Sequence, residues 1–374
     1  MKIVIVTSCS FPASEGLGTH VKSIAENYAN NNHDVEVYIR RSGKGAVEKV
    51  QHCGVTYVLI PSSSIPVISS FVFKHKCETI LNDQEHVIDV IHYHSPLVLP
   101  LNIKHEAKVI TTVHSTMIED TKHIEIINVK SVLYKLMGRF VSPFFENSLF
   151  KASSNVIAVS AGVKDELYSL YKLPTNKVKT IANGIDLGTF RPLCSVGDKT
   201  KTIVYIGRVG FRKGIPELVE AIRLLKNDLL GYRFLIIGSG DLDSYLEGKI
   251  NEYALSDIID WKKHVSQESL PQLLSSSRFL IMPSSYETGP RVVLESISCL
   301  TPTIATQVGL VPQIDDSAYI KIDQSSADKV RDAIQFAINL SPEAYDVYVE
   351  ACRLERNNFN RDISCQELLK TYEN

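Results

Sequence analysis

The sequence predicts an α/β protein built from two doubly wound domains that face each other across a cleft. The chain has 374 residues, more than one ordinary hydrophobic core requires. Apolar residues make up 44% of the chain, which excludes a disordered protein. Short β-branched runs alternate with helical stretches along the whole chain, a pattern typical of parallel sheets that are covered by helices on both faces.

The strands are expected in two sets with a break between them. The first set lies at 2–8, 34–40, 55–60, 87–93, 108–113, 155–159 and 177–181, and the second at 202–206, 233–237, 258–261, 278–282 and 303–306. Residues 190–201 hold Pro, Gly, Ser and charges without periodicity. We therefore expect an N-terminal domain over 1–190, a C-terminal domain over 200–355, and a last helix over 356–374 that packs across the domain boundary. Ligands of such folds bind at the carboxyl ends of the strands.

Composition narrows the partners and the compartment. The formal net charge of −2 argues against nucleic acid as a partner. The seven cysteines are scattered singly, which fits reduced thiols in a cytoplasmic protein. The N-terminal apolar run is too short for a signal peptide, and no 18 apolar residues follow each other, so we expect no membrane-spanning segment.

Residues 206–222, "IGRVGFRKGIPELVEAI", predict an anion site. Arg208 and Lys213 project from a loop that is bounded by Gly207 and Gly214, and a helix begins near Pro216. Two fixed cations beside a helix N-terminus suit a phosphate or diphosphate. A solvated basic loop is the alternative interpretation.

Residues 283–299, "PSSYETGPRVVLESISC", place two glutamates around a predicted helix start at Pro290. The amides of Arg291 and Val292 would be free to bind an anion there. Glu295 lies in an otherwise apolar helix, where an unpaired carboxylate is costly, so we expect it to accept hydrogen bonds from hydroxyls such as a ribose diol. Glu287 could hold another hydroxylated group. Alternatively, Glu295 caps a neighbouring backbone and Glu287 faces water.

Glycine and aspartate patterns elsewhere are less specific. Gly16 and Gly18 follow the first strand and allow a close backbone approach to a ligand, but no complete G-x-G-x-x-G fingerprint is present. The Asp-x-Asp of "GDLDSY" (240–245) could hold a divalent metal. We favour a capping role, because Asp is a preferred residue at a helix start.

Three histidines close two predicted strands, in "VIHYHSP" and "TTVHST". His92 and His94 share one face of their strand, and His114 could lie near them, which leaves a zinc site open. We favour a polar ligand contact for His114 over zinc.

Residues 128–154 mix Lys and Arg with Leu, Met and Phe. Such a basic amphipathic stretch is typical of a helix at an anionic membrane surface, here the inner face of the membrane. A surface helix of the first domain explains the pattern equally well.

Taken together, these stretches resemble glycosyltransferase family 4, retaining enzymes with the GT-B fold of two Rossmann-like domains. "GRVGFRKG" resembles the family's G-R-x-x-x-x-K-G loop, and "YETGPRVVLE" resembles its E-x7-E motif. "IANGID", "SNVIAVSAGVKDEL", "IIGSGDLDSYL" and "ATQVGLVPQI" resemble further family segments. The Glu-Thr-Gly-Pro sequence departs from the common E-G-F-G and is closer to the E-G-x-P-N-V variant of many bacterial polysaccharide enzymes.

The resemblance implies roles for individual residues. Arg208 and Lys213 would grip the donor diphosphate, Glu287 would bind the donor sugar, and Glu295 the ribose hydroxyls. His114 matches the family histidine beside the donor sugar, Gly16 matches the second glycine of the N-terminal loop, and His264 and Val265 fall where the family lines the nucleobase pocket. The expected catalytic residues are His114, Arg208, Lys213 and Glu287. The expected donor-binding residues are Gly16, Arg208, Lys213, His264, Val265, Glu287, Gly289, Pro290, Arg291, Val292 and Glu295, and no metal ligand is expected.

The resemblance also implies a reaction. A sugar, expected as a hexose, would pass from a nucleoside-diphosphate donor, with UDP placed before GDP, to a hydroxyl of a glycan, a lipid-linked glycan or a small molecule. The anomeric configuration would be retained, and fixed cations would stabilise the leaving diphosphate without a metal or other cofactor. No second carboxylate is evident as a nucleophile, so we expect attack from the same face. A sugar-nucleotide epimerase of the same architecture and a non-catalytic sugar-nucleotide-binding partner subunit are the alternatives.

Overall fold

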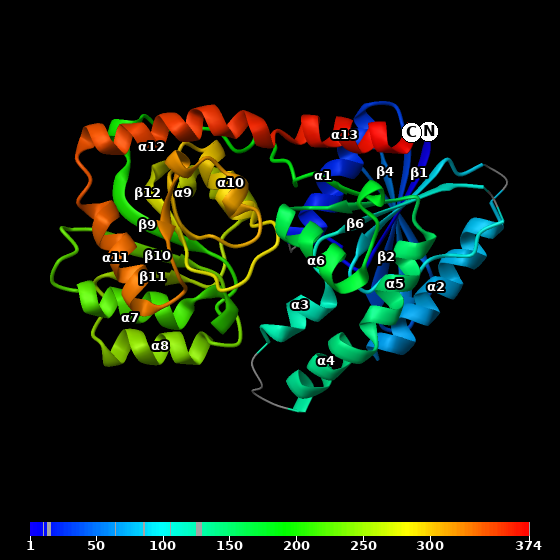
Figure 1. Cartoon of the computed structure of the whole chain (residues 1–374), viewed down its shortest axis with the longest axis horizontal. Coiled ribbons are helices and arrows are strands. Elements are labelled where there is room, and N and C mark those ends of the chain that lie inside the picture. The colour runs from blue at the N-terminus through cyan, green and yellow to red at the C-terminus, as the bar shows by residue number, and fades with distance from the viewer. Residues whose placement is uncertain are drawn as a thin grey trace. The chain divides into compact units, whose positions relative to one another are not determined.

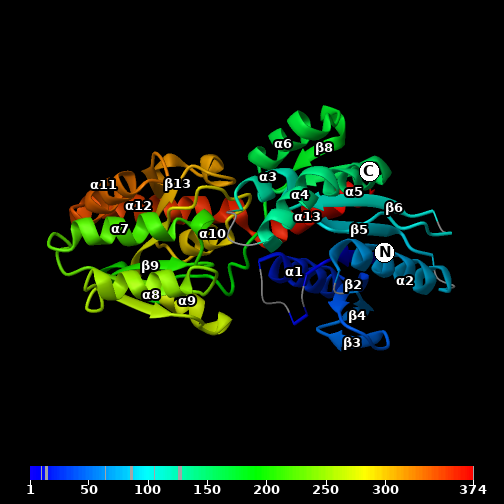
Figure 2. The same ribbon diagram turned by 90° about the horizontal axis from the view of Figure 1, so that it is seen from below.

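The computed structural model describes residues 1–9, 11–12, 16–63, 65–84, 87–104, 106–124 and 129–373. The chain divides into two compact units, each with its own sheet (Figures 1 and 2). The first unit comprises Met1–Asn183 and Asp362–Asn374, and the second comprises Gly184–Arg361. The sequence placed these borders at 190 and 355, so the observed borders lie at slightly different points of the chain.

The first unit holds an eight-stranded sheet in the order β3-β4-β2-β1-β5-β6-β7-β8. Neighbouring strands are parallel except β3 and β4, which form an antiparallel hairpin. Its two-residue turn, Cys53-Gly54, has positive φ at both positions, as hairpins of this length prefer. The strands are β1 (Lys2–Thr7), β2 (Asp34–Ser42), β3 (Glu48–His52), β4 (Val55–Ser62), β5 (Val90–Ser95), β6 (Lys108–Val113), β7 (Asn155–Ala158) and β8 (Val178–Thr180).

Helices cover both faces of this sheet because side chains alternate along each strand. Ile3 and Ile5 of β1 pack in one cluster with α1 and α13, whereas Val4 and Val6 pack in another with α2 and α5. The C-terminal helix α13 thus belongs to the core of the first unit, beside α1 (Figure 1). The helices are α1 (Gly16–Asn30), α2 (Pro66–Asn82), α3 (Met117–Lys122), α4 (Val129–Phe140), α5 (Ser142–Ala152), α6 (Ala161–Tyr171) and α13 (Arg361–Glu373).

The second unit holds a six-stranded, wholly parallel sheet in the order β11-β10-β9-β12-β13-β14. Helices α7, α8 and α11 pack together, and α10 packs with α9 and α12. The strands are β9 (Thr200–Ile206), β10 (Arg233–Ile237), β11 (Ile259–Lys262), β12 (Ser277–Met282), β13 (Thr303–Thr306) and β14 (Tyr319–Ile322). The helices are α7 (Ile215–Leu225), α8 (Asp243–Glu252), α9 (Leu270–Ser276), α10 (Arg291–Ser298), α11 (Ala327–Ile338) and α12 (Pro342–Glu355).

Each sheet has one point where the strand order reverses, and that point determines where a ligand can approach. In the second unit it lies between β9 and β12, and in the first unit between β1 and β5. In open α/β sheets, ligands bind at such a point, beyond the carboxyl ends of the strands. Within the described residues, no helix is long and apolar enough to cross a membrane.

Candidate functional site

The loop after β9 and the loop after β12 are held together at the point where the strand order reverses. Gly214 adopts a φ of +72°, and a Cβ there would lie 2.2 Å from the carbonyl oxygen of Pro283. The backbone N–H of Ser285 donates to the carbonyl of Arg212 at 2.9 Å. The glycine is therefore required by both the turn and the close approach, and the two loops form one surface.

A third loop, after β13, closes against the same surface. Gly309 has a φ of +61°, and a Cβ there would lie 2.6 Å from the carbonyl oxygens of both Glu287 and Thr288. The Thr306 hydroxyl donates to the carbonyl of Ser284 at 2.6 Å. These contacts fix the backbone on both sides of Glu287.

Lys213 and Glu287 form the centre of this surface. The ammonium group of Lys213 donates directly to the Glu287 carboxylate, and the two side chains are 25% and 12% exposed. The Ser284 hydroxyl also donates to Glu287, at 2.9 Å. Burial raises the pKa of the Tyr205 hydroxyl well above its usual range, and the negative charge of Glu287 adds to this rise. A cation for an anionic group and a carboxylate for a hydroxyl thus lie side by side.

Arg208 is more exposed and is paired with the Asp-x-Asp segment. Its guanidinium lies 2.9 Å from Asp241, and the Tyr205 hydroxyl holds its carbonyl at 2.8 Å. Asp243 accepts from the backbone N–H of Gly240 at 2.7 Å. The predicted capping role is therefore wrong in detail: Leu242 precedes α8 without a side-chain cap, and the aspartates bind Arg208 and the turn instead.

The start of α10 agrees with the predicted helix start. Pro290 is the N-cap residue and Arg291 the first helical residue, which follows Gly289 in the loop. The first-turn amides of a helix, here including those of Arg291 and Val292, have no carbonyl partner within the helix. This helix end therefore offers N–H donors and the positive end of the helix dipole next to Glu287.

Glu295 has a partner that the sequence interpretation did not consider. The Arg291 guanidinium, one helical turn earlier, lies 3.5 Å from its carboxylate, and the two side chains are 13% and 12% exposed. Burial raises the pKa of Glu295, and Arg291 opposes that rise. One guanidinium nitrogen of Arg291 is buried without a hydrogen-bond partner among the described residues. The i,i+4 spacing was visible in the sequence and could have predicted the pair.

His264 and Val265 lie on the loop after β11. This strand is separated from β9 by β10, so the two residues are two strands away from Arg208. The intervening loops are in close contact, because a Cβ on Gly238 would lie 1.9 Å from the carbonyl oxygen of Gly207. The indole N–H of Trp261 donates to the carbonyl of Gly238 at 2.9 Å and ties β11 to these loops.

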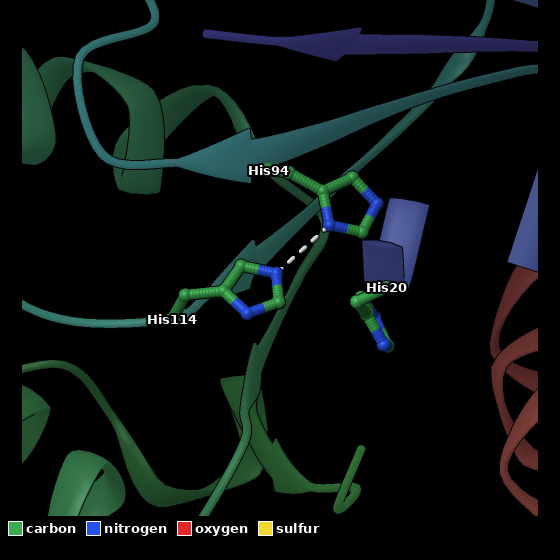
Figure 3. A group of neighbouring side chains, drawn as sticks. All are labelled: His20, His94 and His114. Atoms are coloured by element: carbon green, nitrogen blue, oxygen red, sulfur yellow. Dashed lines mark hydrogen bonds between the residues drawn. The ribbon is translucent and has the colours of Figure 1, made fainter. Parts of the chain in front are cut away.

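The remaining predicted site residues belong to the first unit. Gly16 begins α1, and a Cβ there would meet no atom of the described residues within 4 Å. His114 follows β6, and one of its ring nitrogens hydrogen-bonds to His94 at 2.9 Å (Figure 3).

The histidine group differs from the one predicted. The ring nitrogens of His92 are both engaged, one with Thr112 at 2.7 Å and the other with Tyr372 at 2.6 Å. The ring that joins His94 and His114 is His20 of α1 (Figure 3). Sequence reasoning missed His20 because it lies far from the other two in the chain. Its place in the first helix after β1 was the only signal.

Residues 128–154 form two helices rather than one long amphipathic helix, and residue 128 itself lies outside the described residues. The helical conformation is interrupted at Val141, which separates α4 from α5. Leu133, Leu136, Phe140 and Phe144 are between 50% and 76% exposed. Glu146 of α5 is buried, and burial raises its pKa to about 7 although the Tyr171 hydroxyl and the Met117 amide donate to it.

Comparison with known proteins gives the class first. The structure superposes on sucrose-phosphate synthase from Thermosynechococcus elongatus with a TM-score of 0.81 and 18% identity, covering 100% of this chain and 98% of that one. It superposes on Anabaena Alr3699/HepE in complex with UDP-glucose with a TM-score of 0.71 and 15% identity, covering 100% of both chains. The fold is therefore that of the GT-B glycosyltransferases, as predicted.

The sequence then gives the family. Residues 14–189 match the profile of "Glycosyltransferase Family 4", and residues 195–353 match that of "Glycosyl transferases group 1". An uncharacterized glycosyltransferase of Methanocaldococcus jannaschii is 28% identical over 345 residues, covering 84% of this chain and 82% of that protein. The chain belongs to glycosyltransferase family 4, and it transfers a sugar from a nucleotide-sugar donor.

Proposed function

We propose that the protein is a retaining hexosyltransferase that uses a UDP-sugar and needs no metal ion. The observation that carries this proposal is the Lys213–Glu287 pair beside the start of α10, at the point where the strand order reverses. A solved structure of the same fold contains UDP-glucose, which supports UDP as the nucleotide.

In this proposal the donor diphosphate lies against the loop after β9. Lys213 and Arg208 bind its oxygens, and the first amides of α10 complete the anion site. Glu287 accepts a hydrogen bond from a hydroxyl of the sugar, and Glu295 accepts hydrogen bonds from the ribose hydroxyls. His264 and Val265 contact the base, and in the first unit Gly16 and His114 contact the sugar.

The chemical step follows from where charge develops. As the glycosidic bond to the diphosphate breaks, negative charge grows on the phosphate oxygens and the sugar becomes oxocarbenium-like. Lys213 and Arg208 stabilise the leaving group, and the acceptor hydroxyl attacks from the same face while the departing phosphate takes its proton. A covalent glycosyl adduct trapped on Glu287 would overturn this mechanism.

The acceptor is proposed as a hydroxyl of a cell-envelope glycan or a lipid-linked glycan. The Glu-Thr-Gly-Pro segment, which resembles the variant of bacterial polysaccharide enzymes, supports this choice. Family membership and the Lys213–Glu287 pair favour transfer over the epimerase and partner-subunit alternatives.

The first test is calorimetric titration with UDP, GDP and ADP, each with and without Mg²⁺. We expect metal-independent binding of UDP that is lost in Glu295→Ala and kept in Glu350→Ala, a control at an exposed position of α12. Binding of GDP or ADP alone would reassign the nucleotide, and binding that depends on Mg²⁺ would contradict the metal-free proposal.

We also propose that α4 and α5 touch an anionic membrane surface. Helix α4 has no acidic residue, and exposed apolar side chains, among them Leu136 and Phe144, lie near Lys135 and Arg139 in the sequence. Co-sedimentation with anionic liposomes at low salt should fall in Leu136→Ser/Phe144→Ser. It should be unchanged in Phe336→Ser, which removes an exposed apolar side chain of the second unit. Equal sedimentation with neutral vesicles would show that attraction between the basic residues and anionic lipid does not drive binding.

A further inference from the structure

Three imidazole rings meet where the strand order of the first unit reverses. His20 comes from α1, His94 from the end of β5, and His114 from the residue after β6 (Figure 3). One ring nitrogen of each lies within 4.8 Å of the others. The three residues are brought together from three separate segments of the chain.

His94 directs one ring nitrogen, Nδ1, toward His114. Its side chain is fully buried, and its Nδ1 hydrogen-bonds to Nε2 of His114 at 2.9 Å. Its Nε2 has no hydrogen-bond partner among the described residues. The nitrogen that faces His114 is Nδ1, so an ion shared by the two rings would take the place of their hydrogen bond and would leave Nε2 of His94 as it is.

His92 fixes this group from behind without belonging to it. Its ring lies 4.3 Å from that of His94, centroid to centroid, and both of its nitrogens are held by Thr112 and Tyr372. The ring of His94 therefore packs against a partner that is itself anchored to β6 and α13. Such support holds a ligand ring in position.

We propose that His20, His94 and His114 bind one zinc-class divalent ion, with the fourth position open to water. Imidazole is a preferred ligand of zinc, and sites of three histidines with an open position are a known arrangement. With Zn–N distances of about 2.0–2.1 Å, tetrahedral ligand nitrogens lie about 3.3 Å apart. The nitrogens of His94 and His114, now 2.9 Å apart, would therefore separate by only about 0.4 Å.

The consequence for activity rests on the proposed function. A His114 ring that coordinates the ion cannot contact the donor sugar, so the ion inhibits transfer and a chelator restores it. The binding of the ion itself does not depend on the donor loops, because all three ligands belong to the first unit.

The test uses the whole chain, freed of metal by a chelator and titrated with Co²⁺ as a spectroscopic probe for zinc. We expect one equivalent to give the visible absorption of a tetrahedral cobalt site and Zn²⁺ to displace it. The signal should be lost in His94→Gln and in His20→Gln. It should persist in Cys53→Ser, which disrupts the other cluster of possible ligands, Glu26, His52 and Cys53.

Folding and function are followed separately. Thermal melts show whether each variant is folded, and His114→Gln, at a less buried position, is the second variant if His94→Gln unfolds. Loss of the cobalt signal in Cys53→Ser alone, or no tetrahedral site in the folded wild type, overturns the proposal. Tight cobalt binding without inhibition of transfer overturns only the inhibitory consequence. Failure of the UDP titration, in contrast, affects the proposed donor site and leaves the metal site standing.

Discussion

The two points of strand reversal have the same topology, but one is lined by charged pairs and the other by uncharged polar groups. In the second unit, charged groups face each other in pairs: Lys213 with Glu287, Arg208 with Asp241, and Arg291 with Glu295. At the reversal in the first unit, the buried imidazoles of His92 and His94 are kept uncharged, because burial lowers the pKa of both. Burial, with a smaller contribution from His114, lowers the pKa of His92 to about 3. A parallel sheet thus supplies a place for a ligand, and the side chains on its loops decide which ligand fits.

This contrast is what the proposed site for a charged donor requires. A bound diphosphate needs cations whose positions are fixed before it binds, because moving them during the reaction would slow it. Lys213, Arg208 and Arg291 of this site are each paired with a carboxylate, and the loops are held by close glycine contacts. A neutral, polar surface suits hydroxylated ligands, which carry no charge for it to balance.

The largest expected effect is on the central pair. Lys213→Ala should lower kcat by about 10²–10³, because it removes one donor to the charge that develops on the leaving group. Turnover with a radiolabelled UDP-sugar measures this, and Lys226→Ala at the end of α7 is the matched control. A near-normal rate in folded Lys213→Ala would show that the phosphate site is elsewhere.

Glu146 tests whether burial in the first unit can keep a carboxyl group uncharged. Burial raises its folded-state pKa to about 7, above the usual value near 4.5. The folded state therefore holds this proton more tightly, so the contribution to stability is present at low pH and is lost as pH rises from about 4.5 to about 7. The loss is on the order of 3 kcal/mol.

Urea unfolding of the whole chain at pH 5 and pH 8 measures this loss. Glu146→Gln should remove most of the difference between the two pH values, because the amide cannot ionise. Glu350→Gln, on the exposed face of α12, should leave it unchanged. An unaltered pH profile in Glu146→Gln would mean that another group titrates.

Much of this architecture is readable from the sequence, for reasons that particular elements make clear. Buried parallel strands such as β1 and β10 are continuous apolar runs, and the loop proposed to bind the diphosphate lies directly after another such strand, β9. The edge strand β3, with the sequence EKVQH, has no apolar run because most of it is exposed, and β14 is only four residues long. Strand β3 was missed because an edge strand needs little burial, and β14 was missed because it is too short to stand out, although three of its four residues are buried.

The site shows a similar limit. The sequence was enough to select Glu287 and Glu295 as candidate site residues, because their chemistry and their place in a local pattern can be read directly. It did not predict that Asp241 holds Arg208 or that His20 joins His94. Both pairs join segments far apart in the chain, and such contacts depend on strand order, which no local pattern encodes.

Gly214 tests whether the loops of the second unit must touch. Gly214→Ala places a Cβ against the Pro283 carbonyl in a left-handed conformation, and we expect a loss of about 2 kcal/mol of stability. UDP binding should weaken as well, because the loop after β9 must move. Gly248→Ala in α8 is the control, since a Cβ there meets nothing within 4 Å and should stabilise the helix. Unchanged UDP affinity in Gly214→Ala would show that UDP binding does not depend on the contact between the two loops.

The smallest expected effect concerns the pair within α10. Arg291→Met removes the cation that opposes the raised pKa of Glu295, so that pKa should rise further. A folded-state pKa above the unfolded value makes stability fall as pH rises, so the variant should lose about 1 kcal/mol more than wild type between pH 5 and pH 8.

The double variant Arg291→Met/Glu295→Gln decides whether this pair acts through charge. It should regain most of the stability at pH 8, because no buried carboxylate then remains without a partner. If the double variant is as pH-sensitive as Arg291→Met, Arg291 supports α10 through packing of its stem rather than through its charge. In that case the contrast between the units is carried by Lys213 and Arg208 alone.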